Sequence, residues 1–167
     1  GFGIQIDKIV AHLPKERQTM MFSATLPPGI IKLSSKYLNN PERISVGSMT
    51  QAAPNIQQEL LRVSETEKYP KLLEILKDNA VSTIVFVKTK YGAEKLARLN
   101  HQASAIHGDL RQSRRDRVIA DFRDKKFRIL VATDLAARGL DVPHIELVVN
   151  HDLPQCPEDY IHRIGRT

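Results

Sequence analysis

The sequence contains no tryptophan and a single cysteine, Cys156, in 167 residues. One cysteine excludes a disulfide within the chain, and the six histidines are not spaced for a zinc site. Aromatic residues make up only 5%, which argues against a nucleic-acid platform of stacked aromatic rings. No apolar run approaches the roughly 20 residues of a membrane-spanning helix. These absences argue against a disulfide scaffold, a zinc module and a membrane-spanning segment within this sequence.

The sequence does have a core-forming share of apolar residues, 41%, and a surplus of basic ones. Lysine and arginine number 25 against 19 aspartates and glutamates, which gives a formal charge of +6. We expect a soluble α/β protein of a reducing compartment, the cytoplasm, with no membrane partner. The charge favours a polyanionic partner, although many solvated surfaces are equally basic.

The pattern divides the chain into two parts joined by a small, polar, proline-terminated linker at 47–55. Residues 1–46 are too few to bury a core alone. Because the sequence begins without methionine and stops after a dense charged cluster, we expect an excised segment in which 1–46 end a longer domain. The elements expected there are a helix over Gln5–Leu13, a strand over Gln18–Phe22, a helix that Pro27 and Pro28 open, and a strand over Arg43–Val46.

Residues 56–167 alternate apolar strands with amphipathic helices. Continuous apolar strands of this kind are typical of a parallel sheet covered on both faces. The expected strands are Gln57–Val63, Ser82–Val87, Ala103–Ile106, Phe127–Ala132 and Ile145–Val149, with helices from near Thr66 through Leu76, over Ala93–Leu99, and around Val118–Phe122. Ser64 and Glu67 match a capping box, but Pro70 would then fall past the first turn, which is why we start that helix near Thr66.

Polar residues follow four of these strands, at Lys88-Thr89-Lys90, His107-Gly108-Asp109, Thr133-Asp134 and Asn150-His151-Asp152. Ligands of open parallel sheets bind outside the carboxyl ends of the strands. We therefore expect a wet, partly cationic cleft at this edge. The alternative is that these loops are polar only because they face solvent.

Two clusters favour an anionic ligand over the solvent explanation. The arginine-rich run 110–117 opens a helix, where guanidiniums and a helix N-terminus suit an anion. In the run 133–141, a strand end delivers Thr133 and Asp134, and Arg138-Gly139 turns the chain so that Asp141 faces back. The alternative for these two aspartates is a helix cap and a turn.

The last cluster is His162-Arg163-Ile164-Gly165-Arg166. On a helix Arg163 and Arg166 share a face, and two adjacent guanidiniums repel unless an anion or a carboxylate lies between them. A phosphate is the expected anion because the planar fork of arginine binds it in a bidentate manner. For any single member, a surface salt bridge is the alternative.

These residues resemble the DEAD-box ATP-dependent RNA helicases, the bacterial members closely. The resemblance covers nearly the whole chain, and the last two motifs, in order and at family spacing, make it specific. The matching segments are Ser23-Ala24-Thr25 (motif III), 84–89 (motif IV), Gln112 with Arg115 (the Gln-x-x-Arg motif), 131–142 (motif V) and 162–167 (the start of motif VI).

The resemblance implies the end of one RecA-like domain, a linker and most of a second RecA-like domain, which close around ATP and one RNA strand. It implies that Arg166 is an arginine finger for the γ-phosphate, that Arg163 and His162 line the domain interface, and that Arg138 pairs with a catalytic carboxylate. It further implies that Asp141, Gly139 and Arg166 bind ATP. Ser23 and Thr25 are implied to couple the state of the nucleotide to the binding of RNA. Residues expected to hold RNA phosphates and sugars, or to position the loops that do, are Thr89, Gly108, Gln112, Arg115, Thr133 and Asp134.

Three features depart from the family pattern. The sequence has neither a Gly-x-x-x-x-Gly-Lys-Ser/Thr loop nor an Asp-Glu-Ala-Asp motif, so the phosphate-binding lysine and the Mg²⁺ ligands are expected outside it. The segment between Tyr91 and His107 is several residues shorter than the family norm, and the chain stops before the second arginine of motif VI. We therefore expect a fragment that is inactive alone. We also expect it to be monomeric.

Two other functions compete with this interpretation. One is a nucleic-acid-binding or regulatory module without a catalytic partner, which the partial first domain disfavours. The other is a DNA-translocating helicase of the same superfamily, which the amino-acid sequences of the last two motifs disfavour.

Overall fold

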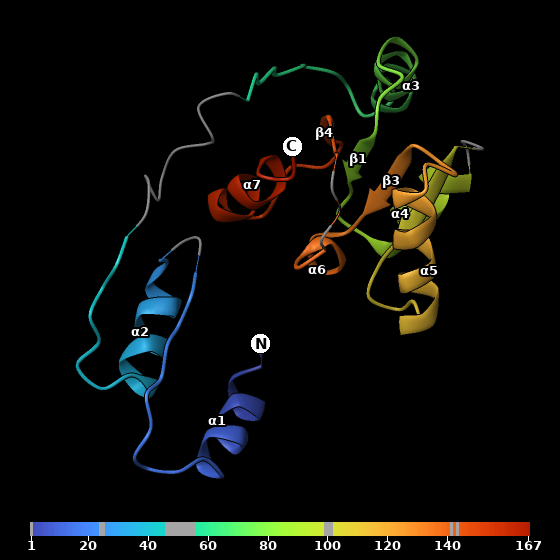
Figure 1. Cartoon of the computed structure of the whole chain (residues 1–167). Coiled ribbons are helices and arrows are strands. Elements are labelled where there is room, and N and C mark those ends of the chain that lie inside the picture. Colours follow the sequence, from blue (N-terminus) through green and yellow to red (C-terminus); the bar gives the residue numbers. More distant parts are fainter. Residues whose placement is uncertain (1, 24–25, 46–55, 99–101, 141, 143) are drawn as a thin grey trace. The chain divides into compact units, whose positions relative to one another are not determined.

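The computed structural model in Figure 1 describes residues 2–23, 26–45, 56–98, 102–140, 142 and 144–167. The chain forms two compact units, Gly1–Thr50 and Gln51–Thr167. The segment 47–55, in which we expect the linker, lies outside the described residues.

The first unit contains two helices, α1 (Gly3–Ala11) and α2 (Pro28–Tyr37). The carboxylate of Asp7 on α1 accepts hydrogen bonds from the Tyr37 hydroxyl at 2.6 Å and from Lys36 Nζ at 2.7 Å, which ties the two helices together. As expected, Pro28 stands in the first turn of α2.

The two strands expected in this unit are wrong for the described residues. Residues 18–22 and 43–45 are irregular, and Val46 lies outside the description. A strand exists only by hydrogen bonding to a neighbour, and within the described part of the unit neither segment has one. Phe22 and Ile44 are accordingly 87% and 82% exposed.

The second unit is built on a parallel sheet of β1 (Thr83–Phe86), β2 (Ala103–Ile106), β3 (Ile129–Ala132) and β4 (Leu147–Asn150). The strand order is β2-β3-β1-β4, and all neighbours are parallel. Thr83 is level with Ile129 on one side and with Leu147 on the other. This register brings the residues after β1, β2, β3 and β4 to one edge, as the sequence predicts.

Helices cover both faces of this sheet, which confirms the expected layered architecture (Figure 1). Successive strand residues point to opposite faces, so Ile84 and Phe86 pack with one layer and Val85 and Val87 with the other. Buried residues of α3 (Lys68–Asp78) and α4 (Lys90–Arg98) cover the second face, and those of α5 (Gln112–Arg123) and α6 (Asp134–Ala137) cover the first. The last helix is α7 (Pro157–Ile164).

The strand expected over Gln57–Val63 is also wrong. These residues are irregular, and Leu60 is 76% exposed. The next helix, α3, begins at Lys68, two residues after the expected start, so Pro70 falls in its first turn. The capping-box pair still interacts, because the Glu67 carboxylate accepts from the backbone N–H of Ser64 at 3.0 Å. Within the described residues, no helix is both long and apolar enough to cross a bilayer.

Candidate functional site

The candidate site lies at the carboxyl edge of the sheet, around the buried side chain of Arg163 on α7. This guanidinium is 2% exposed, an unusual place for a permanent charge. Its Nε and Nη2 donate to the two carboxylate oxygens of Asp134, after β3, at 2.6 and 2.8 Å. Its Nη1 donates to Asn150 Oδ1 at 2.9 Å and to the Asp152 carbonyl at 2.6 Å, both at the end of β4.

Phe86, the last residue of β1, completes this arrangement. Its ring centroid lies 4.9 Å from the Arg163 guanidinium carbon, which is a cation–π contact. We call Arg163, Asp134, Asn150, Asp152 and Phe86 the Arg163 network. It joins the ends of β1, β3 and β4 to α7, so a charge pair shared by motif V and motif VI fixes the corner of the sheet.

This geometry corrects the expectation that a phosphate lies between Arg163 and Arg166. The anion beside Arg163 is the carboxylate of Asp134, whose two oxygens already accept hydrogen bonds from the Arg163 guanidinium in a bidentate arrangement. The same bonds occupy both Asp134 oxygens, so this residue is suited to positioning its loop and not to touching a phosphate. Arg163 is likewise a positioning residue in this unit.

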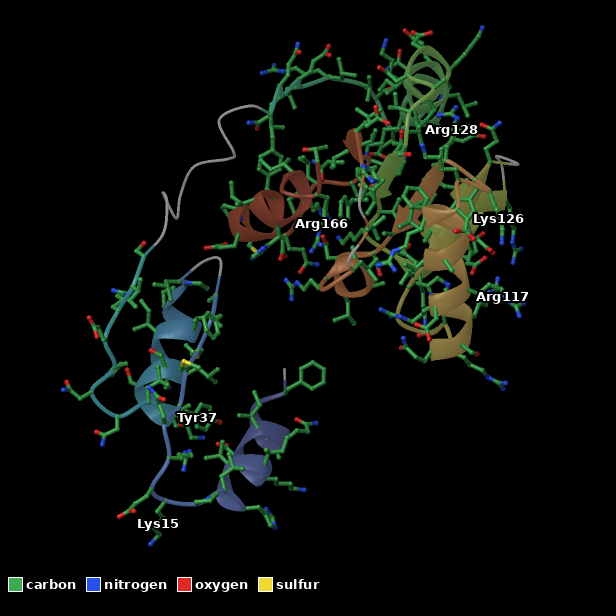
Figure 2. All side chains as sticks on the ribbon, in the orientation of Figure 1. Lys15, Tyr37, Arg117, Lys126, Arg128 and Arg166 are labelled. Carbon is green, nitrogen blue, oxygen red and sulfur yellow. The ribbon has the colours of Figure 1, made fainter. Side chains whose placement is uncertain are left out.

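Arg166 lies beyond the end of α7, after Gly165, and is half-buried (labelled in Figure 2). Its Nη1 donates to the carbonyl of Leu140 at 3.0 Å. Unlike Arg163, it has no carboxylate partner among the described residues. The Arg166 side chain lines a small hollow together with those of Phe86, Asp134, Arg138, His162 and Arg163.

The third arginine at this hollow, Arg138, is bound by a residue of α7. Its Nη2 pairs with Asp159, a residue in the first turn of that helix. Burial raises the pKa of Asp159, but hydrogen bonds from Cys156 and Arg138 outweigh it, and the pKa is lowered. Asp159 was not predicted from the sequence, although an acidic residue in a first helical turn is a common stabilising feature.

Asp152 braces the same corner from the other side. Its Oδ2 accepts the backbone N–H of Lys88, the residue after Val87, at 2.9 Å. Burial acts to raise the pKa of Asp152, but the Lys88 hydrogen bond and the charges of His151 and Lys68 lower it. The sequence placed Asp152 at a polar strand end, but only the structure shows that it joins β4 to β1.

The chain turns between α6 and the hollow at Gly139, whose φ is +70°. Glycine adopts this left-handed conformation without the strain of a Cβ, which agrees with the turn expected at Arg138-Gly139. Asp141 lies outside the described residues, so its expected position near the nucleotide stays a prediction.

A second cluster occupies the same edge of the sheet, at the ends of β2 and β3. Gly108 follows β2 and lies close to α6, since a Cβ on it would be 3.7 Å from Leu135 Cδ2. Arg115 on α5 donates to the carbonyl of Ala136 on α6 at 3.3 Å, and its Nε is buried without a partner in the described structure. Thr133, at the N-cap of α6, makes no side-chain capping bond and is half-buried.

Gln112 and Thr89 are exposed members of this edge. Gln112 Nε2 donates to Asp116 Oδ1 at 2.7 Å on the same helix. Thr89 Oγ1 accepts the backbone N–H of Gly92 at 3.0 Å and so caps the start of α4. A cap is a sufficient structural reason for a threonine there, so a ligand role for Thr89 stays a prediction.

Two polar contacts hold the loop that carries Gly108. Glu94 on α4 lies 2.9 Å from Nε2 of the buried His107, and Lys90 pairs with Asp109. Because both contacts come from α4, they fix the residues on either side of Gly108 to a packed helix. Of the two residues expected to couple nucleotide and RNA, Ser23 is exposed in the first unit and Thr25 lies outside the described residues.

Comparison with known families identifies the second unit. A model described as "Helicase conserved C-terminal domain" matches residues 67–167. The chain is 45% identical over 172 aligned residues to the DEAD-box ATP-dependent RNA helicase CshA of Geobacillus kaustophilus, and 43% identical to the ATP-dependent RNA helicase DbpA of Bacillus subtilis. Each alignment covers 100% of this chain but only 37% and 36% of the relative, so the chain spans about a third of their length.

Solved structures give the same result. The chain resembles Dbp5 of Saccharomyces cerevisiae bound to RNA and ADP BeF3, with a TM-score of 0.88 and 35% identity over 100% of this chain and 46% of that one. It also resembles a DEAD box protein of Methanococcus jannaschii, with a TM-score of 0.65 and 40% identity over 99% of this chain and 46% of that one.

Proposed function

We propose that this chain, which belongs to the helicase conserved C-terminal domain family, is one part of an ATP-dependent RNA helicase. In this proposal it supplies an arginine finger and contacts to the RNA backbone. The chain is related along its whole length to DEAD-box RNA helicases, bacterial ones among them, which supports this assignment. Since its sequence holds no phosphate loop and no Asp-Glu-Ala-Asp motif, it is expected to be inactive alone. Its expected place of action is the cytoplasm, as a monomer.

The observation that carries the proposal is the contrast between the arginines at the hollow. Arg163 and Arg138 are charge-paired with Asp134 and Asp159, whereas Arg166 donates only to a backbone carbonyl in the described structure. Its positive charge is therefore available to an anion. A positioned cation of this kind stabilises the charge that develops on a transferred phosphoryl group.

The other residues at the hollow would bind and orient the nucleotide. Arg138 and His162 line the hollow together with Arg166. We expect the Gly139 turn and Asp141 to approach the ribose, and Arg163 to hold Asp134 and α7 in place. ATP is the substrate in this scheme, and the Mg²⁺ that accompanies it would be held by carboxylates outside this sequence.

The second cluster would hold the RNA strand. Arg115 offers an Nε that is buried without a partner among the described residues, and Gly108 is exposed at the same sheet edge. Thr133, Thr89 and Gln112 add hydroxyl and amide groups at the same sheet edge. Side chains of these kinds form hydrogen bonds with phosphates and sugars, so we expect RNA binding that is independent of the base sequence.

Unwinding would follow from differential binding. ATP favours a closed state of two domains, and that state holds a strand conformation that a duplex cannot adopt. Hydrolysis then releases the strand. Ser23 and Thr25 are expected to link the two events. A DNA helicase and a module without catalysis are the alternatives, and comparison of ATPase stimulation by RNA and by DNA in the complete helicase separates all three.

The sharpest test is Arg166→Ala in the complete helicase that carries this segment. A finger acts in the transition state, so kcat should fall by about 10³-fold while ATP affinity changes little. Arg98→Ala on α4, which removes an exposed arginine elsewhere in the second unit, is the control and should leave kcat unchanged. Equal losses of kcat and ATP affinity would contradict the finger role.

A further inference from the structure

Three arginines at the N-cap and in the first turns of α5 have no acidic partner among the described residues. Arg111, Arg114 and Arg117 are all exposed, and none forms an ion pair within the described part of the chain. We call these three residues the arginine strip. They are distinct from Arg115, which is half-buried and turned toward α6.

The members of the strip are neighbours on the surface. They are spaced three residues apart, and the backbone N–H of Arg114 donates to the carbonyl of Arg111 at 3.0 Å, so the first pair spans one helical turn. The strip advances about 9 Å along the helix axis from Arg111 to Arg117. Like charges at such spacing repel, which costs the helix a few tenths of a kcal/mol per pair.

The acidic residues of α5 do not offset this repulsion. Asp116 accepts from Gln112, and Asp121, four residues after Arg117, accepts from Lys126 at 2.6 Å. Arg117, four residues before Asp121, therefore has no carboxylate partner within the described part of the chain. The hydrogen bond to Asp121 raises the pKa of Lys126, and the positive charge of Arg117 acts against that rise. Arg117 on α5 and Lys126 after it are labelled on the same side of Figure 2.

The strip begins where the proposed RNA site ends. The loop from Gly108 leads directly into Arg111 and the first turn of α5, which also carries Gln112 and Arg115. A strand held by those three residues therefore lies within one helical turn of the strip. Guanidiniums repeated along one helix suit a regularly spaced row of phosphates, to which each fork can bind.

We propose that the arginine strip binds phosphates of an RNA strand that continues beyond the Gly108, Gln112 and Arg115 contacts, and so extends the RNA site along α5. The inference rests on the proposed function, because it takes that site as its starting point. It goes further by assigning three residues other than Gln112 and Arg115, the two positions that define the Gln-x-x-Arg motif.

The test measures binding of the 167-residue chain to fluorescent oligouridines of about six and about twenty nucleotides, as a function of potassium chloride. The variants are R111Q/R114Q/R117Q and Arg115→Gln. The matched control is K8Q/K32Q/K77Q, which removes the same charge from exposed lysines of three other helices. Each phosphate contact to a single strand contributes about 0.7 to the slope of log affinity against log salt.

We expect the strip variant to lower the slope for the long RNA by about 2, from three lost contacts, and to leave the short RNA unchanged. Arg115→Gln should weaken binding of both lengths, and the lysine control should alter neither slope by more than about half as much as the strip variant.

Three results would overturn the inference. The first is a strip variant that binds the long RNA with the affinity and the salt slope of the wild type, while Arg115→Gln still weakens binding of RNA of both lengths. That result would leave the proposed function intact. The second is an equal loss from the lysine control. The third comes from the same titration repeated with fluorescent polyglutamate. A strip variant that loses binding of polyglutamate but not of RNA would identify an acidic protein surface as the partner. Absence of RNA binding by the wild-type chain would contradict the proposed function itself.

Discussion

Arg163 and Arg166 lie three residues apart, yet the regions around them differ in kind. Arg163 is buried, and its donors are taken by Asp134, Asn150 and a backbone carbonyl. Arg166 is half-buried at the rim and donates to the Leu140 carbonyl alone in the described structure. Two arginines only three residues apart thus occupy different environments, one buried among polar partners and one half-buried with no carboxylate partner among the described residues.

The largest expected effect comes from breaking the interior region. Arg163→Met should lower the free energy of unfolding of the second unit by about 3 kcal/mol, because Asp134 loses its partner in a partly buried place. Hydrogen exchange of peptides covering β1 and β3 reports this unit directly. R163M/D134N should recover part of the loss, since the unpaired charge is then removed. A double variant as unstable as the single one would contradict the charge-pair explanation.

The sequence predicts the sheet of the second unit well, because its signals are local. Apolar runs such as Ser82–Val87 and Ala103–Ile106 are buried strands whose partners lie within the chain. The same kind of signal failed for Gln18–Phe22 and Gln57–Val63, which pair with no neighbouring strand among the described residues. A strand pattern is a necessary condition for a strand, and a hydrogen-bonding neighbour is the other one.

The site was predictable in its residues but not in its pairings. The sequence placed Asp134, Asn150, Asp152 and Arg163 at strand ends or on a helix near one edge. It could not show that Arg163 reaches Asp134 across 29 positions, because spacing along the chain does not fix side-chain direction in space. Asp159 was missed for the same reason, since its partner Arg138 lies 21 positions away.

The second effect in size tests how the interior region holds its charge. Phe86→Leu should lower the stability of the second unit by about 2 kcal/mol, because it removes buried ring atoms and the cation–π contact with Arg163. A double-mutant cycle with Arg163→Met separates the two contributions and should give a coupling of about 1 kcal/mol. Additive losses would mean that the ring contributes packing alone.

Acid titration should show a smaller effect at Asp152. Its pKa is lowered in the folded state by the Lys88 N–H and the nearby cations, despite burial. The stabilisation is therefore full above the unfolded pKa of about 4 and is lost as pH falls through the folded value. Asp152→Asn should lower the free energy of unfolding at neutral pH by about 1 kcal/mol. It should also make the decrease of that free energy below pH 4 less steep. An unchanged acid limb in hydrogen exchange of β1 and β4 would contradict this assignment.

The smallest expected effect on stability completes the comparison. Arg166→Ala should change the stability of the second unit by less than about 0.5 kcal/mol, because the side chain is half-exposed and its loss leaves one carbonyl near solvent. The same hydrogen-exchange measurement on β1 and β3 provides the value, with Arg163→Met as the matched arginine loss. A destabilisation as large as that of Arg163→Met would show that Arg166 belongs to the interior network. A neutral result, combined with a large loss of kcat in the complete helicase, would separate the arginine that builds the site from the arginine that acts in it.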